Sequence, residues 1–340
     1  MIVVLTTPEH GYTLESLVNG SFGFPVPQIR IASYSEYLKA GKVSVSRATH
    51  VFTDIERLSP NLLRAAANLY RRLQSLGVRC LNDPARVLSR AELLTVLHDR
   101  GLNPTRVYRA DTLPRPVSFP VFMRTEDDHE TPEPTLYACQ AELDEALARF
   151  RANGMPLRGL LVIEKVDAPY SESLWAKWGT WRIGERIVVE HIAVDDQWLV
   201  KYGRHECLTE AVTADEHDAV TTNRFERMLL PLFEIAGIEF GRADHAWTPA
   251  GTVVFEINTN PFLGPYAEDP WPLRKKAQTI ARERLADALR ALEMRSRTPA
   301  QLSWDGGGGG GGGPSGAAMM NLACDGERNR HDGCDSITER

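Results

Sequence analysis

Residues 241–261 read GRADHAWTPAGTVVFEINTNP, and this stretch decides the fold of the chain. Both halves alternate between apolar and polar residues, which is typical of half-buried strands. Between them, Pro249 and Gly251 are turn formers, because proline presets φ and glycine accepts a positive φ. We therefore predict an antiparallel β-hairpin whose loop is centred on Ala250.

That register places Asp244 opposite Glu256 and Arg242 opposite Asn258. Side chains alternate across a strand, so these four polar side chains share one face of the hairpin. A slip of one residue would set Asp244 beside an aromatic side chain, and the pattern therefore favours this register. The other face is predicted to pack into the core. Its residues are Ala243, Trp247, Val253, Phe255 and Ile257.

The polar face of the hairpin has the chemistry of a metal site. Carboxylate oxygens from Asp244 and Glu256, with the amide oxygen of Asn258, are the ligands that a hard cation such as Mg²⁺ prefers, with Mn²⁺ as an alternative. Arg242 beside them suits an anionic group such as a phosphate or a carboxylate. The simpler alternative is an ordinary hairpin whose outer face carries solvated polar residues.

These residues also carry a family resemblance. Arg242-x-Asp244, followed by Glu256-x-Asn258-x-Asn260, resembles the C-terminal metal motif of ATP-grasp enzymes of the glutathione synthetase and ribosomal-protein glutamate ligase type. The resemblance implies that Asp244, Glu256 and Asn258 hold the Mg²⁺ ions that bridge the phosphates of ATP. It also implies a three-lobed α/β (α+β) fold, in which a small parallel α/β lobe precedes two α+β lobes that clasp ATP.

Three further segments are similar to the same superfamily, and the likeness spans about residues 48–293. Residues 80–84 (CLNDP) and 101–105 (GLNPT) flank an amphipathic helix that leads into the central lobe. Residues 160–166 (LLVIEKV) resemble the hinge strand that contacts adenine. These segments support the assignment only because they occur in this order.

The hinge resemblance implies a nucleotide-binding role for four consecutive residues. The backbone of Glu164, Lys165 and Val166 would hydrogen-bond adenine, and Asp167 would reach the ribose. The alternative is that Glu164 and Asp167 are ordinary residues of an edge strand and a turn.

Three basic residues are candidates to contact phosphate or the reacting group. Arg124 and Lys201 each end an apolar strand, where a cation can emerge into a cleft, although such residues are also common solubilisers. Arg182 matches a family position for a cation near the transferred group; its alternative is a surface strand residue paired with a glutamate. The chain departs from the family in having arginine rather than lysine at Arg124 and an acidic run with one histidine, TEDDHETP, at 125–132.

Aromatic residues and two loops provide further candidates. Tryptophans could stack on a base or a substrate, but large aromatics are more often core anchors. The segments at 12–24 and 262–271 would flank an acceptor site in a three-lobed arrangement. The tryptophans concerned are Trp175, Trp178, Trp181 and Trp198.

Composition is that of a globular enzyme and excludes several classes. The chain has 340 residues, 43% of them hydrophobic, and a net charge of −6, which gives no electrostatic case for nucleic acid or an anionic membrane. No apolar run approaches the ~20 residues that cross a bilayer. The first seven residues are too short and lack the basic start of a signal peptide. Five dispersed cysteines form no disulfide framework, so we expect a cytoplasmic protein.

The remaining pattern divides the chain into an α/β lobe at 1–103, a central lobe at 104–170, a C-terminal lobe at 171–304 and a tail at 305–340. The tail begins with a run of glycines and is polar, so we predict that it is disordered; two cysteines and a histidine in it are more simply exposed residues than a metal site. We predict a loop at 11–27. Strands are expected at 1–8, 29–31, 50–52, 78–81, 117–123 and 160–164. Helices are expected at 61–76, 91–100, 141–152 and 273–292.

The function that the resemblance implies is an ATP-dependent carboxylate–amine ligase that works through an acyl phosphate. Its substrates would be a small carboxylate and an amine, with amino acids or peptides as the default, and a homo-oligomer is a common state among such enzymes. Two alternatives remain open. The same machinery could phosphorylate a hydroxyl as a small-molecule kinase, or the altered phosphate loop could leave a non-catalytic, ATP-binding regulatory protein.

Overall fold

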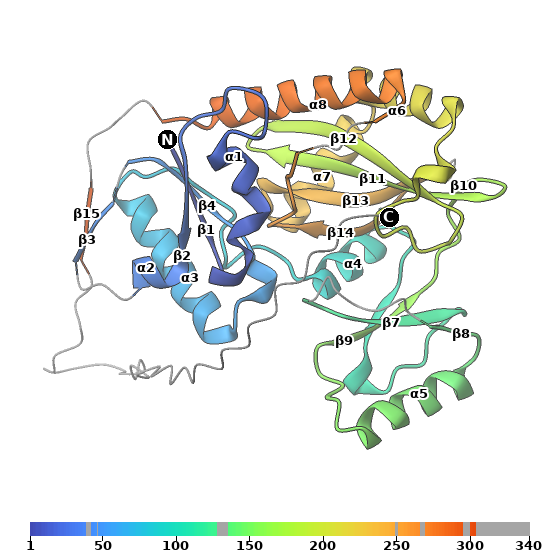
Figure 1. Ribbon diagram of the computed structural model, residues 1–340. Helices are drawn as coiled ribbons and strands as arrows, with labels where there is room; N and C mark the ends of the chain where they lie inside the picture. The colour runs from blue at the N-terminus through green and yellow to red at the C-terminus, as the bar shows by residue number, and fades with distance from the viewer. Residues whose placement is uncertain are drawn as a thin grey trace, which may run out of the picture. The chain divides into compact units, whose positions relative to one another are not determined.

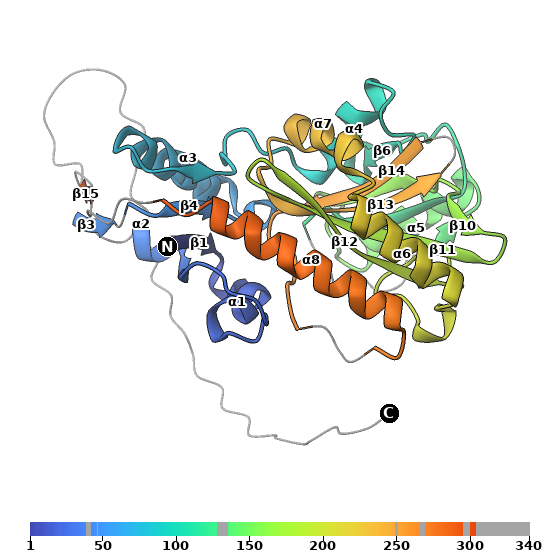
Figure 2. The same cartoon turned by 90° about the horizontal axis from the view of Figure 1, so that it is seen from above.

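Four parallel strands form the N-terminal sheet, in the order β2-β1-β4-β5 (Figure 1). All residues of β1 are buried, because β1 is central and both faces of the sheet are covered, and this explains its continuous apolar sequence. One face packs on α3 and the other on α8, with β1 and β4 drawn between the two helices in Figure 2. The bounds are β1 Ile2–Thr6, β2 Ile29–Ser33, β4 Thr49–Phe52, β5 Cys80–Leu81, α3 Pro60–Ser75 and α8 Pro272–Ala291.

The segment between β1 and β2 is helical, where a loop was predicted at 11–27. A 3₁₀ helix, η1 (Pro8–Leu14), is followed by α1 (Glu15–Asn19). Leu14 and Leu17 are buried in the core that the sheet shares with α8. This packing stabilises the short helices, although the glycines and prolines of the segment have low helix propensity. The other small elements of this region are α2 Tyr34–Leu38, η2 Ile55–Arg57 and the antiparallel strand pair β3 Lys42–Val45 with β15 Ala300–Ser303.

The central sheet is antiparallel, with the order β6-β9-β7-β8. Helix α5 (Gln140–Ala152) packs its apolar stripe on one face, below the sheet in Figure 1. The predicted strand at 117–123 begins later, because the N–H groups of Val117 and Ser118 donate to the carboxylate of Glu164 instead of to a neighbouring strand. The bounds are β6 Val107–Arg109, η3 Ala110–Thr112, β7 Val121–Thr125, β8 Leu136–Tyr137 and β9 Leu160–Glu164.

Helix α4 (Arg90–Asp99) joins the first sheet to the second and begins one residue before the predicted helix at 91–100. The hydroxyl of Ser89 accepts from the N–H of Glu92 at 3.4 Å, and the Glu92 carboxylate accepts from the N–H of Ser89 at 2.8 Å. This capping box satisfies two N-terminal donors of the helix. It fixes the start of α4, which carries Arg90 toward the site described below.

The C-terminal sheet has the order β10-β11-β13-β14, with β12 paired to β11. Helices α6, α7 and α8 cover one face and bury an extensive apolar core, which leaves the opposite face for the site (Figure 1). The bounds are β10 Pro169–Ser171, β11 Leu174–Ile183, β12 Arg186–Asp195, η4 His205–Cys207, α6 Glu210–Thr222, α7 Glu226–Ala236, β13 Phe240–Thr248 and β14 Gly251–Asn258.

Asn82 connects the parallel sheet to the C-terminal sheet. Its side-chain nitrogen donates to the carbonyls of Phe52 at 2.9 Å and Phe240 at 2.7 Å, and its side-chain oxygen accepts from the N–H groups of Glu239 and Phe240. Asn82 is fully buried and has a φ of 61°, a conformation that asparagine tolerates better than most residues. One polar side chain therefore fixes how the two sheets meet.

The mixed α/β fold class is confirmed by a four-stranded parallel sheet together with a four-stranded and a five-stranded antiparallel sheet. The division into lobes at 103, 170 and 304 stays a prediction. The predicted disordered tail lies outside the described residues. No helix in the described parts of the chain is both long and apolar enough to span a membrane. The structure describes residues 1–38, 42–45, 47–127, 135–248, 251–265, 269–294 and 300–303.

Candidate active site

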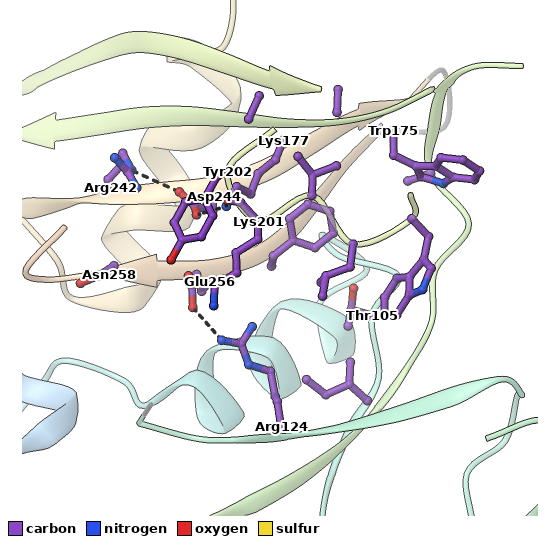
Figure 3. A pocket seen from close by; sticks show the side chains of 18 of the residues that line it. Thr105, Arg124, Trp175, Lys177, Lys201, Tyr202, Arg242, Asp244, Glu256 and Asn258 are labelled. Carbon is purple, nitrogen blue, oxygen red and sulfur yellow. Dashed lines mark hydrogen bonds and ion pairs between the residues drawn. The ribbon is translucent and has the colours of Figure 1, made fainter. Parts of the chain in front are cut away.

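The β13–β14 hairpin has the predicted register at its polar end. Arg242 pairs with Asn258, and Asp244 pairs with Glu256. All four side chains line one cavity of about 510 Å³, a volume typical of sites for small molecules. Figure 3 shows them extending from the two neighbouring strands into this space. The prediction that these four side chains share a face is therefore confirmed.

Beyond Asp244 the register shifts by one residue. His245 pairs with Val254, which leaves Phe255 without a partner in the ladder. Such a bulge turns an extra side chain toward one face, and here Phe255 and Glu256 both line the cavity.

The bulge corrects the predicted core face. Ala243 and Ile257 do join the helix-covered core. Val253 packs instead with Ala246 and Ala168 beside the cavity, together with Phe255. Trp247, near the hairpin turn, is 45% exposed.

Asp244 is a buried carboxylate held by two cations. Lys177 Nζ lies 3.1 Å from Oδ2, and Arg242 Nε lies 3.2 Å from Oδ1. Burial by itself would raise the pKa of Asp244, but the charges of Lys177 and Arg242 outweigh it and hold the pKa below 3.8. Lys177 is further fixed by donating to the carbonyl of Lys201 at 2.8 Å.

Glu256 is held by two arginines from other parts of the chain. Arg90, at the start of α4, donates to its Oε2, and Arg124 Nη2 from β7 lies 3.5 Å from the same oxygen. Arg90 also donates to the carbonyl of Thr125 at 3.0 Å, which ties β7 to the hairpin. Glu256 therefore connects the central sheet to the C-terminal sheet.

A second bulge, in β12, supplies Glu190. The register of β11 with β12 shifts between Gly179 and Thr180 and leaves Glu190 without a ladder partner. Glu190 accepts from Trp181 Nε1 at 2.8 Å and lies 3.4 Å from Arg242 Nη1. Burial alone would raise its pKa, but His191 at 3.1 Å and Arg242 lower it to about 2.

Gly179 makes room for this arrangement. A Cβ atom at Gly179 would lie 2.7 Å from Cε1 of His191, closer than carbon atoms pack. The His191 ring, which lines the cavity, can therefore lie against β11 only because residue 179 has no side chain.

One end of the cavity is apolar. The rings of Phe122 and Trp198 pack with centroids 5.1 Å apart, and Lys165 Nζ lies 5.9 Å from the centre of the Trp198 ring. A flat apolar ligand would find aromatic and aliphatic side chains to pack against here. The lining side chains of this end are Phe122, Ile163, Val166, Ala168, Trp198, Leu199 and Phe255.

The predicted adenine-contacting residues separate into two groups. Glu164, Lys165 and Val166 line the cavity. The N–H of Lys165 already donates to the carbonyl of Pro120, and the Glu164 carboxylate accepts from Tyr108 and from two backbone N–H groups. Asp167 is not among the lining residues; its side chain is 72% exposed and lies 3.4 Å from Lys165 Nζ.

The predicted basic residues also separate. Arg124 and Lys201 line the cavity beside the hairpin carboxylates (Figure 3). Arg182 does not line it: this guanidinium is buried and donates to the carbonyls of Gly184 and Ile238. Its separation from Lys177 along β11 is odd, which places the two side chains on opposite faces of the strand. The predicted contact of Arg182 with the reacting group therefore has no support in the geometry.

The start of the unusual acidic run faces away from the cavity. Glu126 accepts from Arg109 at 2.9 Å and from the N–H of Ala91 at 3.4 Å, and it does not line the cavity. The rest of that run from residue 128, including His129, lies outside the described residues.

The 3₁₀ helix η1 and the segment after β14 form the other end of the cavity. Tyr12, Thr13 and Phe262 line it. Asn260 fixes this wall, because its side chain accepts from the Thr13 hydroxyl at 2.7 Å and donates to the carbonyl of His10 at 3.2 Å. The cavity thus runs from an apolar end, past the charged hairpin, to a polar end.

Sequence reasoning missed Lys177, Arg90 and Glu190. Lys177 carries a weak signal, since a lysine between Trp175 and Trp178 in a strand is a cation in an apolar setting. Nothing local marks Arg90 or Glu190. Of the four tryptophans, Trp178 and Trp181 are core residues, and Trp175 and Trp198 line the cavity.

The donor set can hold a divalent cation only together with a ligand. No group of three His, Cys, Asp or Glu side chains suited to a metal occurs within the described residues. Asp244, Glu256 and Asn258 converge, but Asp244 and Glu256 are each paired with cationic side chains. Mg²⁺ commonly takes one or two carboxylates and completes its shell with phosphate oxygens and water. The residues therefore fit Mg²⁺ that arrives with a phosphorylated ligand.

Comparison with known proteins gives structural matches alone. No protein-family model and no curated protein matches the sequence. Among solved structures, the chain is similar to the D-alanine–D-alanine ligase from Bacillus anthracis complexed with ATP, with 12% identity over 86% of this chain and 97% of that one and a TM-score of 0.46.

Two further similar structures have comparable scores. For the RimK domain ATP-grasp protein from Sphaerobacter thermophilus, the identity is 13% over 86% of this chain and 100% of that one, with a TM-score of 0.46. For the ATP-grasp ligase PsnB complexed with precursor peptide PsnA2 and AMPPNP, the identity is 12% over 86% of this chain and 96% of that one, with a TM-score of 0.47. The last two of these structures are ATP-grasp proteins. Because the identities are this low, we base the function on the geometry of the cavity.

Proposed function

We propose that this protein is an ATP-dependent carboxylate–amine ligase. The observation that carries the proposal is the order of chemistry along one cavity: an apolar end, then facing carboxylates among cations, then a polar wall from the N-terminal lobe. Residues of β14 and of the segment after it mark this order, since Phe255, Glu256, Asn258 and Asn260 follow one another along the chain. A nucleotide with its base, its phosphates and an acceptor beyond them has the same order.

The apolar end suits adenine. The side chains of Trp198 and Phe122 would pack against the base, and stacking of this kind contributes about 1–3 kcal/mol per base. The N–H of Val166 donates to no partner among the described residues and is our candidate donor to a ring nitrogen. Oε1 of Glu164 accepts from Tyr108 and from the N–H groups of Val117 and Ser118, so the role we assign to this oxygen is to shape the hinge.

The middle of the cavity suits a polyphosphate. Cations outnumber carboxylates in its lining, where Lys177, Lys201, Arg124 and Arg242 lie beside Asp244 and Glu256. Arg90 and Glu190 do not line the cavity, but they contact Glu256 and Arg242, respectively. A triphosphate would complete the charge balance with short charge-assisted hydrogen bonds. Asp244, Glu256 and Asn258 would hold Mg²⁺, which when bound shields the phosphate charge during transfer.

The reaction would proceed in two steps. A substrate carboxylate takes the γ-phosphoryl group, which turns a poor electrophile into an acyl phosphate with a good leaving group. An amine then attacks the acyl carbon, and phosphate leaves. Arg242, fixed by Asp244 and Glu190, is placed to stabilise the negative oxygen that develops on the acyl carbon, and such a preorganised donor is worth about 3 kcal/mol.

One observation favours a non-catalytic alternative. Asp244 and Glu256 are both satisfied by cationic side chains in this structure, so an ATP-binding protein that does not turn ATP over would need no rearrangement of these pairs.

The test is ATP turnover with Mg²⁺ against pooled amino acids and small carboxylic acids, following ADP, phosphate and product mass together. A condensed product with ADP and free phosphate supports the ligase. A phosphorylated acceptor would instead show a kinase, and bound ATP without ADP formation would show a binding protein. Trp198→Ala should weaken ATP binding about 10-fold, whereas the matched variant Trp247→Ala, at an exposed tryptophan outside the cavity, should not change it.

A further inference from the structure

A cluster at the polar end of the cavity has a geometry that neither the metal hairpin nor the nucleotide end requires. His10 lines the cavity and lies above Asp54, with His10 Nδ1 3.0 Å from Asp54 Oδ2 and 2.8 Å from the hydroxyl of Thr7. Asp54 is fully buried, whereas the His10 side chain is 27% exposed. The Asp54 carboxylate is thus buried beneath the imidazole ring of His10, and the ring itself is exposed to the cavity.

The hydrogen bonds select one tautomer of His10. Asp54 also accepts from the backbone N–H and hydroxyl of Thr7 and from Arg57. Burial alone would raise the pKa of Asp54, but these donors and the charge of Arg57 lower it from its ordinary value, which favours the ionised carboxylate that can only accept. The proton of the neutral imidazole must then be on Nδ1, which leaves the lone pair on Nε2.

Nε2 of His10 has no hydrogen-bond partner within the described residues. By contrast, both ring nitrogens of the buried His50 have hydrogen-bond partners. Asp54 is also in the left-handed region, with a φ of 59°, and such backbone strain is often kept where a side chain must be aimed.

His10 is tied to the reacting end of the hairpin by short links. The Asn260 side chain donates to the His10 carbonyl at 3.2 Å, and the Asn260 N–H donates to Asn258 Oδ1 at 2.7 Å. Arg242 Nη1 lies 3.4 Å from the carbonyl of Phe262, on the same wall. The imidazole therefore borders the space beyond the phosphate-binding side chains, where an acceptor amine would enter.

We propose that His10, oriented by Asp54, is the general base that deprotonates the attacking amine. This role rests on the ligase function proposed above. The amine nitrogen forms a bond to the acyl carbon, and one of its N–H protons passes to the Nε2 lone pair. The C–O bond to the phosphoryl group then breaks, and its electron pair leaves with inorganic phosphate. The imidazolium, stabilised by the Asp54 carboxylate, returns its proton to solvent. Base catalysis of this kind contributes about 10²–10⁴-fold.

The test compares two nucleophiles in the full-length protein. Hydroxylamine is unprotonated and strongly nucleophilic at neutral pH, so it traps an acyl phosphate without a base. With ATP, Mg²⁺ and a pool of the amino acids as both acid and amine, His10→Gln should lose about 100-fold in condensed product. With hydroxylamine added, the hydroxamate yield of His10→Gln should stay within about 3-fold of that of the wild type. Added imidazole should partly restore amine condensation in His10→Ala.

Controls separate this role from a structural one. His205→Gln changes an exposed histidine in η4 and should match the wild type in both assays. Thermal midpoint and ATP affinity of His10→Gln should equal those of the wild type. Equal losses with both nucleophiles, or no loss with the amine, would overturn the role of His10 while the ligase function stands. If the wild type forms neither hydroxamate nor ADP, the ligase function fails and this inference with it.

Discussion

Asp244 lies directly opposite Glu256 in the β13–β14 ladder, yet the two carboxylates are held by different parts of the chain. Asp244 is bound by Lys177 and Arg242 of the same sheet, whereas Glu256 is bound by Arg90 and Arg124, which come from α4 and the central sheet. One carboxylate therefore belongs to a local network, and its neighbour connects two sheets. We therefore expect substitutions of the two carboxylates to affect the stability of the protein differently.

We expect Glu256→Gln to destabilise the protein and Asp244→Asn to do so much less. Removing the Glu256 charge leaves Arg90, whose side chain is 6% exposed, with the carbonyl of Thr125 but without a carboxylate partner, and breaking such a pair costs about 3 kcal/mol. Lys177 and Arg242 keep other acceptors when Asp244 changes. Urea denaturation of both variants measures the difference, and both should lose ATP turnover. Equal destabilisation would contradict the division into a local and a connecting carboxylate.

Lys177 should contribute to ATP affinity through its charge. Lys177→Met keeps the length of the side chain but removes the cation beside Asp244, so we expect ATP to bind about 10-fold more weakly, or about 1.4 kcal/mol. Lys276→Met, at an exposed lysine of α8, is the matched control and should bind ATP normally. Calorimetric titration with Mg²⁺ and ATP provides the measurement. Unchanged affinity in Lys177→Met would show that the lysine only neutralises Asp244.

The hairpin register could be predicted because it depends on residues that are close in the sequence. Alternation and turn chemistry place Arg242 opposite Asn258 without knowledge of the rest of the fold. The bulges at Glu190 and Phe255 each insert an extra residue that no sequence pattern marks, and the predicted core face failed at Phe255 for this reason. Bulges next to a site are common, since they re-aim side chains.

Cations that come from distant elements could not be assigned either. Arg90 and Glu256 are 166 residues apart, and only the packing of α4 against β14 brings them together. Arg182 was assigned from its likeness to a family position, but strand alternation places it on the face away from Lys177. The family resemblance thus pointed to a residue of β11 whose side chain does not line the cavity.

Asn82 should be needed for stability because its side chain makes four hydrogen bonds between two sheets. Asn82→Ala leaves buried backbone groups unpaired and places a non-glycine residue at a φ of 61°, so we expect a loss of about 3 kcal/mol or more. Asn82→Gly also removes the side-chain hydrogen bonds, but glycine adopts a positive φ without strain. It should therefore be destabilised less than Asn82→Ala, which differential scanning calorimetry can measure. A variant pair with equal midpoints would assign the whole effect to the hydrogen bonds.

The buried His50 should make stability depend on pH. Burial lowers its pKa to about 4 from an ordinary 6.5, and its ring is used in the neutral form, with Nδ1 donating to the carbonyl of Ala48 at 2.9 Å and Nε2 accepting from Tyr37 at 3.1 Å. Between pH 6.5 and 4 the unfolded chain binds this proton and the folded chain does not. The stability from His50 is therefore complete above pH 6.5 and falls as the pH drops toward 4, by up to about 1.4 kcal/mol per pH unit.

The slope itself is the test of that assignment. Urea denaturation of the wild type and of His50→Gln at several pH values between 4.5 and 7.5 gives the free energy of unfolding of each, and glutamine cannot take up the proton. We expect His50→Gln to be less stable at pH 7.5 but to lose less stability on acidification, because other groups titrate equally in both proteins. Parallel pH curves for the two proteins would mean that His50 takes up its proton equally in the folded and the unfolded chain, which would contradict the lowered pKa of its buried ring.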